Sequence, residues 1–479
     1  LVLIEIIIDS IKALMIIRGH GLDNNQDGCF MTSIFFCINL LIIINNIFGD
    51  YMKKTIWSSY KLKSYPALDK DIKTDVLVIG GGTCGVLCAY YLSKDFNVVL
   101  VEADKLAGCK TLRTTATITA VEDVCYTELK RKKGLKYAEL YYESNLEAIK
   151  EYSRLAKKYH FDFEVVDSSK YTLDDEKLIN LEYKLLKSMN ADCHLFDKWS
   201  LPFNIQSGFT LHNQAQMNPM LLINELSKEF TIYENTRIEA IKKNIAYTKN
   251  NKIEAKHIVI CTGYPFQKLK GGFFYKLIQY KSYVISTNNP FPFKGNNVGT
   301  KPSNLYFRSY KDKLLIGCND MKVGKKKNGF EDLINFAIKH NLDVEDCWIN
   351  QDTMSLDKVP YIGKLKKNLY VATGFNMWGM TKSMTSALII RDMILKKENK
   401  FKHIFSPYRA MYILPLMRNL GGAILGLLKP TKKRCNHLGC GLSYNQMEDV
   451  YECSCHGSKY TKGGNLIDGP AQKNNKSCK

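Results

Sequence analysis

The sequence lacks several patterns that would assign it to a common class. No Ser-His-Asp arrangement and no pair of carboxylates stands out from the background, so the sequence names no acid–base residue. Most of the 15 cysteines are scattered singly, which excludes the disulfide framework of a small secreted protein. No signal-peptide cleavage site follows the apolar N-terminal part. These absences fit a protein of the reducing cytoplasm.

The formal net charge of +21 also comes without a nucleic-acid-binding motif. Lysines are spread along the whole chain, in short runs such as residues 130–133 and 325–327. We therefore interpret the charge as solvated surface and expect no nucleic-acid partner. Weak attraction to anionic lipid or to a substrate stays open. The length of 479 residues suggests two to four domains.

Residues 1–51 form a hydrophobic N-terminal extension. Within it, residues 30–49 are 20 uncharged residues, which is long enough to span a bilayer. They are either a membrane anchor, which would make the protein membrane-associated, or upstream sequence translated from an over-extended reading frame. Because Met52 is followed by two lysines and looks like a natural start, we favour the second interpretation.

A glycine-rich turn is the clearest motif of the N-terminal half. A short apolar run typical of a doubly buried strand leads into Gly80, Gly82 and Gly85, and a helical pattern follows. A second strand over residues 97–101 ends in Glu102. In such a turn the glycines allow a tight bend, close approach of a pyrophosphate and close helix–strand packing, while the acidic residue binds ribose hydroxyls. The spacing and context predict dinucleotide binding.

Two later segments favour FAD over NAD. Residues 258–263 form a strand that ends in Thr-Gly, and residues 368–375 form another strand that turns into a helix near residue 379. The N-terminus of that helix would stabilise negative charge on a reduced flavin. Beyond the fingerprint, the residues expected to contact the dinucleotide are Thr114, Thr115, Thr262, Gly263, Gly374, Gly379, Met380 and Thr381.

Two boxes of metal-binding residues lie near the end of the sequence. The first contains Cys435 and His437, and the second contains Cys453 and His456. Cysteine and histidine bind both zinc and iron, so four ligands at these spacings also satisfy a Cys₂His₂ zinc site. A zinc finger, however, needs neither the further cysteine in each box nor the Gly-Ser-x-Tyr that follows the second box.

These boxes resemble the Rieske [2Fe–2S] domain, in which two cysteines hold one iron and two histidines the other. The resemblance implies that Cys435, His437, Cys453 and His456 are the cluster ligands. It further implies a disulfide between Cys440 and Cys455, hydrogen bonds from Ser458 and Tyr460 to the cluster sulfurs, and a covering loop over residues 469–471.

Residues 72–400 resemble the FAD oxidoreductases related to D-amino-acid oxidase and glycine oxidase. More closely, the order of parts resembles a bacterial family that joins this flavoprotein to a C-terminal Rieske domain. The resemblance implies a substrate domain around residues 160–215 and 275–350, and makes Arg308 a candidate partner for a substrate carboxylate. A surface strand arginine remains the alternative. Tyr283, Tyr306 and Trp378 are candidate pocket walls or ordinary core aromatics.

The expected fold is α/β, or α+β overall: a Rossmann-like FAD-binding domain with an inserted mixed-sheet substrate domain, and a small all-β Rieske module. Residues 401–432 would link the two units, and residues 433–475 would form the module. In the linker we expect a helix packed on the flavin domain. A module this small should depend on its cluster for folding.

We therefore expect an FAD-dependent oxidoreductase that oxidises an amine or amino acid and passes electrons from FAD to a [2Fe–2S] cluster. An external acceptor, a protein or a quinone, would then receive them. One alternative is an oxidase that uses O₂ directly and keeps the Rieske unit as structure. Another is a membrane-associated electron-transfer protein with no small-molecule substrate.

Overall fold

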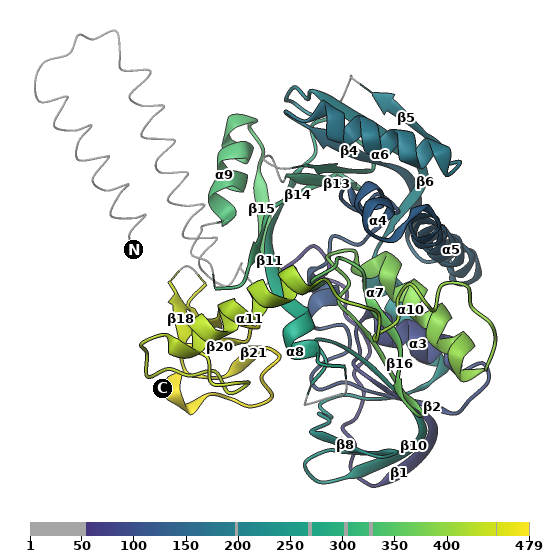
Figure 1. The fold of residues 1–479 in the computed structure, drawn as a ribbon, viewed down its shortest axis with the longest axis vertical. Coiled ribbons are helices and arrows are strands. Elements are labelled where there is room, and N and C mark those ends of the chain that lie inside the picture. The colour runs from purple at the N-terminus through teal and green to yellow at the C-terminus, as the bar shows by residue number, and fades with distance from the viewer. Residues whose placement is uncertain are drawn as a thin grey trace, which may run out of the picture.

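The computed structural model describes residues 54–196, 200–266, 271–300, 305–324, 329–446 and 448–478. The expected N-terminal extension, residues 1–51, lies outside this part of the chain, so both of its interpretations, a membrane anchor or an over-extended reading frame, stay untested. None of the described helices is long and apolar enough to cross a bilayer. Figure 1 shows two sheet layers with helices around them and a small third unit at the C-terminal end.

The first layer is a mainly parallel sheet in the order β16-β17-β10-β1-β2-β7. Its strands are β1 (Ile72–Ile79), β2 (Val98–Val101), β7 (Thr231–Tyr233), β10 (Lys252–Gly263), β16 (Tyr361–Lys366) and β17 (Leu369–Thr373), and β8 (Ala240–Lys242) and β9 (Ile245–Tyr247) extend β10. Along β1, Val76 and Val78 join one hydrophobic core while Leu77 and Ile79 join another. Both faces of the strand are buried, as its continuous apolar run predicts.

Helices α3 (Thr83–Leu92) and α10 (Gly379–Ile394) pack in the core on one face of this sheet. The long helix α5 (Leu135–Tyr159) lies beside them and buries Tyr141, Ala148, Tyr152 and Leu155, a spacing of three, four and seven residues. The hydroxyl of Tyr152 donates to the carbonyl of Met380 at 2.9 Å. The amphipathic pattern of α5 therefore fixes the position of the N-terminus of α10.

The second layer is a nine-stranded mixed sheet in the order β15-β11-β14-β13-β12-β4-β6-β3, with β5 beside β6. Its strands are β3 (Thr117–Ile118), β4 (Phe163–Thr172), β5 (Cys193–Phe196), β6 (Ser207–Met217), β11 (Leu277–Asn288), β12 (Asn296–Gly299), β13 (Tyr306–Tyr310), β14 (Lys313–Lys322) and β15 (Val344–Ser355). In this sheet the pair β4–β12 is parallel, and the other described strand pairs are antiparallel. The mixed sheet is the expected one, and its assignment as a substrate domain stays a prediction.

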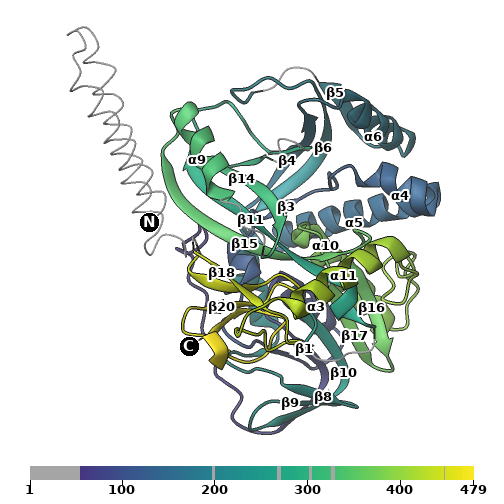
Figure 2. The ribbon, with the colours of Figure 1, turned by 60° about the vertical axis from the view of Figure 1, so that its left-hand side comes forward.

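Further helices are α4 (Cys125–Lys133), α6 (Glu176–Ser188), α7 (Pro219–Leu226), α8 (Phe273–Lys276) and α9 (Gly329–Lys339). Figure 2 shows α4, α5 and α6 on the same side of the molecule. Residues 128–200 are rich in glutamate, lysine, leucine and tyrosine at helical spacing, which predicts long amphipathic helices. In the structure, β4 and β5 interrupt these helices and belong to the second sheet.

The C-terminal unit is a four-stranded antiparallel sheet of β18 (Leu442–Asn445), β19 (Val450–Cys453), β20 (Lys459–Thr461) and β21 (Leu466–Asp468). Helix α11 (Ile413–Leu428) precedes it. In Figure 1 this yellow unit lies beside α11 and close to α8 and β11. The architecture is therefore the expected one: a Rossmann-like layer, a mixed-sheet layer and a small β module.

Candidate active site

The glycine-rich turn has the backbone geometry that a bound pyrophosphate requires. At Gly80, which has a φ of +110°, a Cβ would lie 2.7 Å from the carbonyl oxygen of Cys261. At Gly85 a Cβ would lie 1.8 Å from the carbonyl oxygen of Gly80, so only glycine fits. Gly82 is the N-cap of α3 and gives its first turn no side-chain cap. The N-terminus of α3 thus offers backbone N–H groups and its positive dipole to an anion.

The acidic residue that follows β2 closes this turn. One carboxylate oxygen of Glu102 accepts from the N–H of Gly81 at 2.6 Å, and the other accepts from the N–H of Asp104 at 3.0 Å. These bonds fix the carboxylate at the edge of the cavity, where its remaining lone pairs can accept from ribose hydroxyls. The arrangement fits the adenosine half of FAD.

A cavity of about 430 Å³ extends from this turn. The expected dinucleotide residues that line it are Gly80, Gly82, Glu102, Thr114, Thr262, Gly263, Gly379 and Met380, whereas Gly85, Thr115, Gly374 and Thr381 are not part of its wall. The N-terminus of α10 therefore faces the cavity, and its contact with the flavin stays a prediction. A Cβ at Gly379 would meet nothing within 4 Å, so the backbone there is open to a ligand.

The cavity wall also includes polar residues that belong to no sequence motif. The Nζ of Lys110 donates to the hydroxyl of Thr353 at 3.0 Å. The side-chain amide of Asn350 donates to the carboxylate of Asp352 at 2.9 Å. Burial raises the pKa of Asp352, although the positive charge of Lys110 acts to lower it. Asn350 and Asp352 are two apart on β15 and face the same side. Sequence reasoning missed these positions, because their role arises only when β15 pairs with β11.

The two Cys-His boxes lie together in the C-terminal unit. The rings of His437 and His456 are edge to face, with centroids 4.9 Å apart. The Nδ1 atoms of both rings are buried and have no hydrogen-bond partner in the described part of the chain. Burial lowers the pKa of each imidazole to about 4, which keeps it neutral. Neutral imidazoles whose Nδ1 atoms are buried and unpaired, beside Cys435 and Cys453, fit the donor set of a Rieske cluster.

Hydrogen bonds shape the loops that carry these residues. The N–H groups of Cys435 and Cys453 donate to Cys440 and Ser458 carbonyls, at 2.8 and 2.9 Å. The hydroxyl of Tyr460 lies 3.5 Å from the sulfur of Cys435. The hydroxyl of Ser458 accepts from the N–H of Ala471 at 3.0 Å, which ties the covering loop to the second box. Tyr460 is thus close to a ligand sulfur, as its expected role requires, while Ser458 holds the loop.

The expected disulfide is not formed in the structure. Cys440 and Cys455 are both free, although their sulfur atoms and that of Cys453 lie within 4.8 Å of one another. The three thiols share one buried space, so their proximity alone does not select a pair. The pairing of Cys440 with Cys455 stays a prediction.

Arg308 is buried on β13, and no residue of the large cavity's wall comes from that strand. Its guanidinium donates to Gln216 at 3.2 Å and to the carbonyl of Met217 at 3.0 Å. Its NH1 atom is buried without a hydrogen-bond partner in the described residues. The rings of Trp57 and Tyr310 cover it, with centroids 5.4 and 5.3 Å from its Cζ atom.

The three aromatic pocket candidates have other surroundings. Tyr283 packs edge to face on Phe330 and its hydroxyl bonds to Glu448. Tyr306 lies over Gly317, and Trp378 is the half-buried N-cap residue of α10. The structure brings none of the three into the wall of the large cavity. Trp57 and Tyr310, which the sequence does not mark as functional, are the aromatic residues that contact Arg308.

The Rieske-like unit forms part of the wall of the dinucleotide cavity. Its contribution comes from Leu466, Ile467, Asp468, Gly469, Ala471 and Gln472. Tyr264 lines the same cavity, and its ring centroid lies 6.2 Å from that of His437. Gln279, another wall residue, donates to the carbonyl of Gly469 at 2.6 Å. One cavity therefore touches both the glycine-rich turn and the neighbourhood of the metal-binding boxes.

Buried charges hold the unit against the second sheet. Lys281 on β11 pairs with Glu448 and Glu452 of the C-terminal unit, the latter at 2.9 Å. Lys459 pairs with the same two glutamates, at 2.8 and 3.5 Å. Burial alone would raise the pKa of Glu448, but the two ammonium groups outweigh it and lower the pKa to about 2. The network is fully charged near neutral pH.

Comparisons with known proteins agree with this geometry. The family model described as FAD dependent oxidoreductase matches residues 75–393, and the model described as Rieske [2Fe-2S] domain matches residues 423–479. YhfW of Bacillus subtilis (strain 168), which is named as a Rieske 2Fe-2S iron-sulfur protein, is 28% identical over 500 residues, covering 90% of this chain and 98% of its own.

Two solved structures share the fold. Glycine oxidase from Geobacillus kaustophilus has a TM-score of 0.60 and 16% identity, and covers 71% of this chain and 100% of its own. An L-amino acid deaminase from Proteus vulgaris, with a deleted insertion, has a TM-score of 0.61 and 17% identity. The match covers 76% of this chain and 100% of the deaminase chain. With its glycine-rich cradle, its paired Cys-His boxes and these matches, the chain belongs to the FAD dependent oxidoreductase family and carries a Rieske domain, with FAD and a [2Fe–2S] cluster as its cofactors.

Proposed function

We propose that this oxidoreductase takes electrons from an amine or amino acid and passes them from FAD through its Rieske cluster to an external acceptor, a protein or a quinone. The observation that supports this most strongly is the shared cavity. Its wall contains the glycines that cradle a dinucleotide, and also the loop that covers the cluster-binding boxes. Tyr264 belongs to that wall and contacts His437. A protein that used its Rieske unit only as structure would not require this arrangement.

The residues of the chain hold and insulate the two cofactors. Gly80, Gly82 and the N-terminus of α3 would bind the pyrophosphate, and Glu102 the ribose. When bound, FAD supplies the two-electron acceptor for carbon beside a neutral amine. Histidine ligation gives Rieske centres potentials of about −150 to +300 mV, above those of plant-type ferredoxins, which favours transfer toward the cluster.

Arg308 is our candidate partner for a substrate carboxylate, and it lies buried outside the wall of the shared cavity. Unpaired buried donors are rare, and its NH1 atom is one. Burial lowers the pKa of Arg308 to about 9, so the guanidinium still carries its charge at neutral pH. Trp57 and Tyr310 would exclude water from a carboxylate held there. The structural relatives named as glycine oxidase and L-amino acid deaminase support the same substrate class.

An anaerobic titration tests the proposal. Purified protein is mixed with amino acids and with the corresponding amines that lack a carboxylate, while flavin absorbance and the EPR signal of the reduced cluster are recorded. We expect an amino acid to bleach the flavin and to produce the cluster signal in the same reaction. Flavin bleaching with a cluster that stays oxidised, and stoichiometric peroxide in air, would instead establish the O₂-using oxidase.

Variants of Arg308 test the substrate class separately. Arg308→Lys keeps a positive charge without the planar fork, and Arg308→Gln removes the charge. We expect the glutamine variant to lose its preference for amino acids over the matching amines, by about 100-fold in kcat/KM, which corresponds to roughly 3 kcal/mol for a charged hydrogen bond. An unchanged preference in Arg308→Gln would remove Arg308 from the substrate site.

A further inference from the structure

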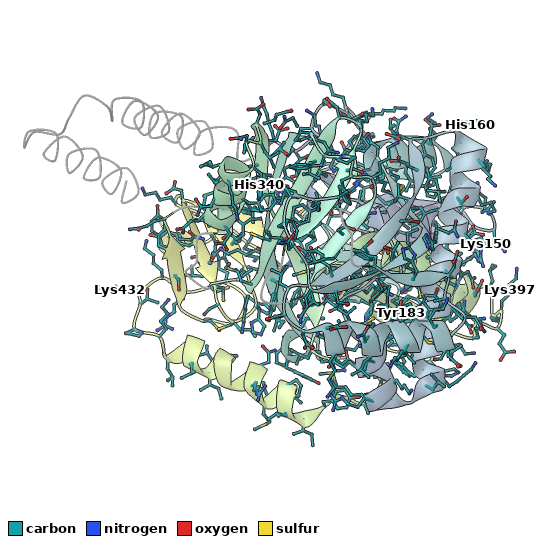
Figure 3. The ribbon with its side chains drawn as sticks, turned by 90° about the horizontal axis from the view of Figure 1, so that it is seen from above. Lys150, His160, Tyr183, His340, Lys397 and Lys432 are labelled. Atoms are coloured by element: carbon teal, nitrogen blue, oxygen red, sulfur yellow. The ribbon has the colours of Figure 1, made fainter. Side chains whose placement is uncertain are left out.

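Helix α11 (Ile413–Leu428) directs its large apolar side chains away from the protein. Its buried residues are Asn419 and Gly426, and a Cβ at Gly426 would lie 2.2 Å from the sulfur of Cys455. The small residues therefore face the cluster module. The side chains that are 57 to 76% exposed are those of Ile413, Leu414, Met417, Ile424, Leu425 and Leu428. In Figure 3, α11 runs along the outer edge of the molecule with its side chains pointing outward.

This pattern is the reverse of that of a helix packed on a soluble core, which buries its leucines and exposes small or polar residues. The apolar surface continues beyond the helix. Asn419 donates to the carbonyl of Tyr275 at 2.9 Å, which joins α11 to α8, where Phe274 is 45% exposed. Leu438, in the first ligand loop, is 44% exposed. An exposed apolar surface of this kind marks an interaction site.

The charge around the helix indicates which kind of partner binds this surface. From Asn399 to Gln446 the sequence contains no aspartate or glutamate, and it contains eight lysines and arginines. Arg418 is exposed on the helix itself, and Lys432 is exposed just beyond its C-terminal end (Figure 3). A second copy of the chain would bring two such basic surfaces together. A negatively charged lipid surface matches both the charge and the apolar face.

The length of the helix determines how it would lie. Sixteen residues span about 24 Å, which is less than the hydrocarbon thickness of a bilayer. We propose that α11 docks the protein on the surface of an anionic bilayer, parallel to it, with its row of leucines and isoleucines below the headgroups. Because α11 contacts Cys440 and Cys455 through Ala423 and Gly426, docking brings the cluster-binding loops to the membrane surface.

Vesicle flotation of the holoprotein tests this proposal. The vesicles contain either phosphatidylcholine alone or phosphatidylcholine with one third phosphatidylglycerol. The test variant is Ile424→Gln with Leu428→Gln, both on the exposed face. The matched control is Leu181→Gln with Leu195→Gln, two exposed leucines of the substrate domain. Flavin and cluster spectra confirm that each variant keeps both cofactors.

We expect the wild type and the control to float with anionic vesicles, and the α11 variant to bind on the order of 100-fold more weakly, about tenfold for each residue that no longer enters the bilayer. Binding should also weaken as salt is raised. Three outcomes would overturn the proposal: no flotation of the wild type, equal flotation of the α11 variant, or a wild-type dimer that the α11 variant dissociates without any lipid effect. If flotation were lost only when residues 1–51 are removed, that segment and not α11 would be the membrane-binding element.

Discussion

Replacement of Lys281 by methionine should loosen the Rieske module from the flavin domain without removing either cofactor. The ammonium of Lys281 is completely buried between Glu448 and Glu452, which are 5% and 2% exposed. Methionine keeps most of the side-chain volume but leaves the two carboxylates to share Lys459. Removal of one partner from a buried ion pair costs about 3–5 kcal/mol.

That cost translates into a measurable loss of docking. At 1.4 kcal/mol for each factor of ten, the equilibrium between docked and undocked modules should fall by roughly 100- to 4,000-fold. The N–H of Gly324 donates to Glu452 across the interface at 3.1 Å, so its hydrogen exchange reports undocking. We expect its exchange to accelerate by that factor, measured on the peptide that contains Gly324.

Two matched variants make this experiment decisive. Lys252→Met removes a half-exposed surface pair with Asp71 and should change the free energy of unfolding by less than about 1 kcal/mol. Lys281→Met combined with Glu448→Gln restores a one-to-one pairing and should recover much of the protection. If Lys281→Met exchanged no faster at Gly324 than Lys252→Met, the buried charges would not hold the interface.

The network also gives the interface a pH dependence. The pKa of Glu448 is lowered to about 2, from 4.5. The stabilisation that Glu448 gives to the docked module is therefore complete above about pH 4.5 and is lost as the pH falls toward 2. The pKa of Lys281 is raised against the effect of burial by the two glutamates, so its contribution is lost only when the pH rises through that raised value. In Lys281→Met the excess negative charge can be neutralised by protonation, so its defect should shrink between pH 8 and pH 5.

Two further predictions concern the cofactor sites. His456→Ala should abolish the rhombic EPR signal of the reduced cluster and acceptor turnover while leaving the flavin absorbance intact, because the glycine cradle belongs to a separate layer; loss of FAD from this variant would contradict the separation. Gly82→Ala should fold normally, since its new Cβ would meet only a hydroxyl at 3.3 Å, but should bind FAD at least tenfold more weakly, as measured by flavin fluorescence titration. Gly463→Ala, where the nearest atom lies at 3.9 Å, is the control, and equal FAD affinity in the two variants would refute the assignment.

The sequence was most informative where function depends on neighbouring residues. The turn from Gly80 to Gly85 needs its glycines for steric reasons that hold in any protein, so its geometry could be predicted. The same is true of the Cys-His boxes, where the spacing within each loop brings the donors together. The doubly buried strand before the turn was equally predictable, because a short, continuous apolar run ahead of a glycine-rich turn is typical of a strand covered on both faces.

Residues whose role depends on distant partners could not be found in this way. Asn350 and Asp352 reach the cavity only through the pairing of β15 with β11. Lys281 looks like any lysine of an alternating strand until Glu448 and Glu452 are placed against it. The aromatic candidates show the same limit, because the sequence alone does not distinguish a core tyrosine from a pocket tyrosine in a strand of the second sheet.

The small size of the Rieske module accounts for the polar character of its interface. Its sheet has four short strands, and the sequence before Cys435 adds no second sheet to cover it. The flavin domain supplies that cover: Gln351 donates to the carbonyl of Gly457 at 2.8 Å, and Gln279 donates to that of Gly469. These carbonyls belong to the loops around the cluster, so the flavin domain satisfies backbone groups that would otherwise be buried without partners. A module completed in this way has little freedom to swing between a donor and an acceptor. In the function that we propose, the external acceptor would therefore have to reach the docked module, and α11 is a surface that lies beside it.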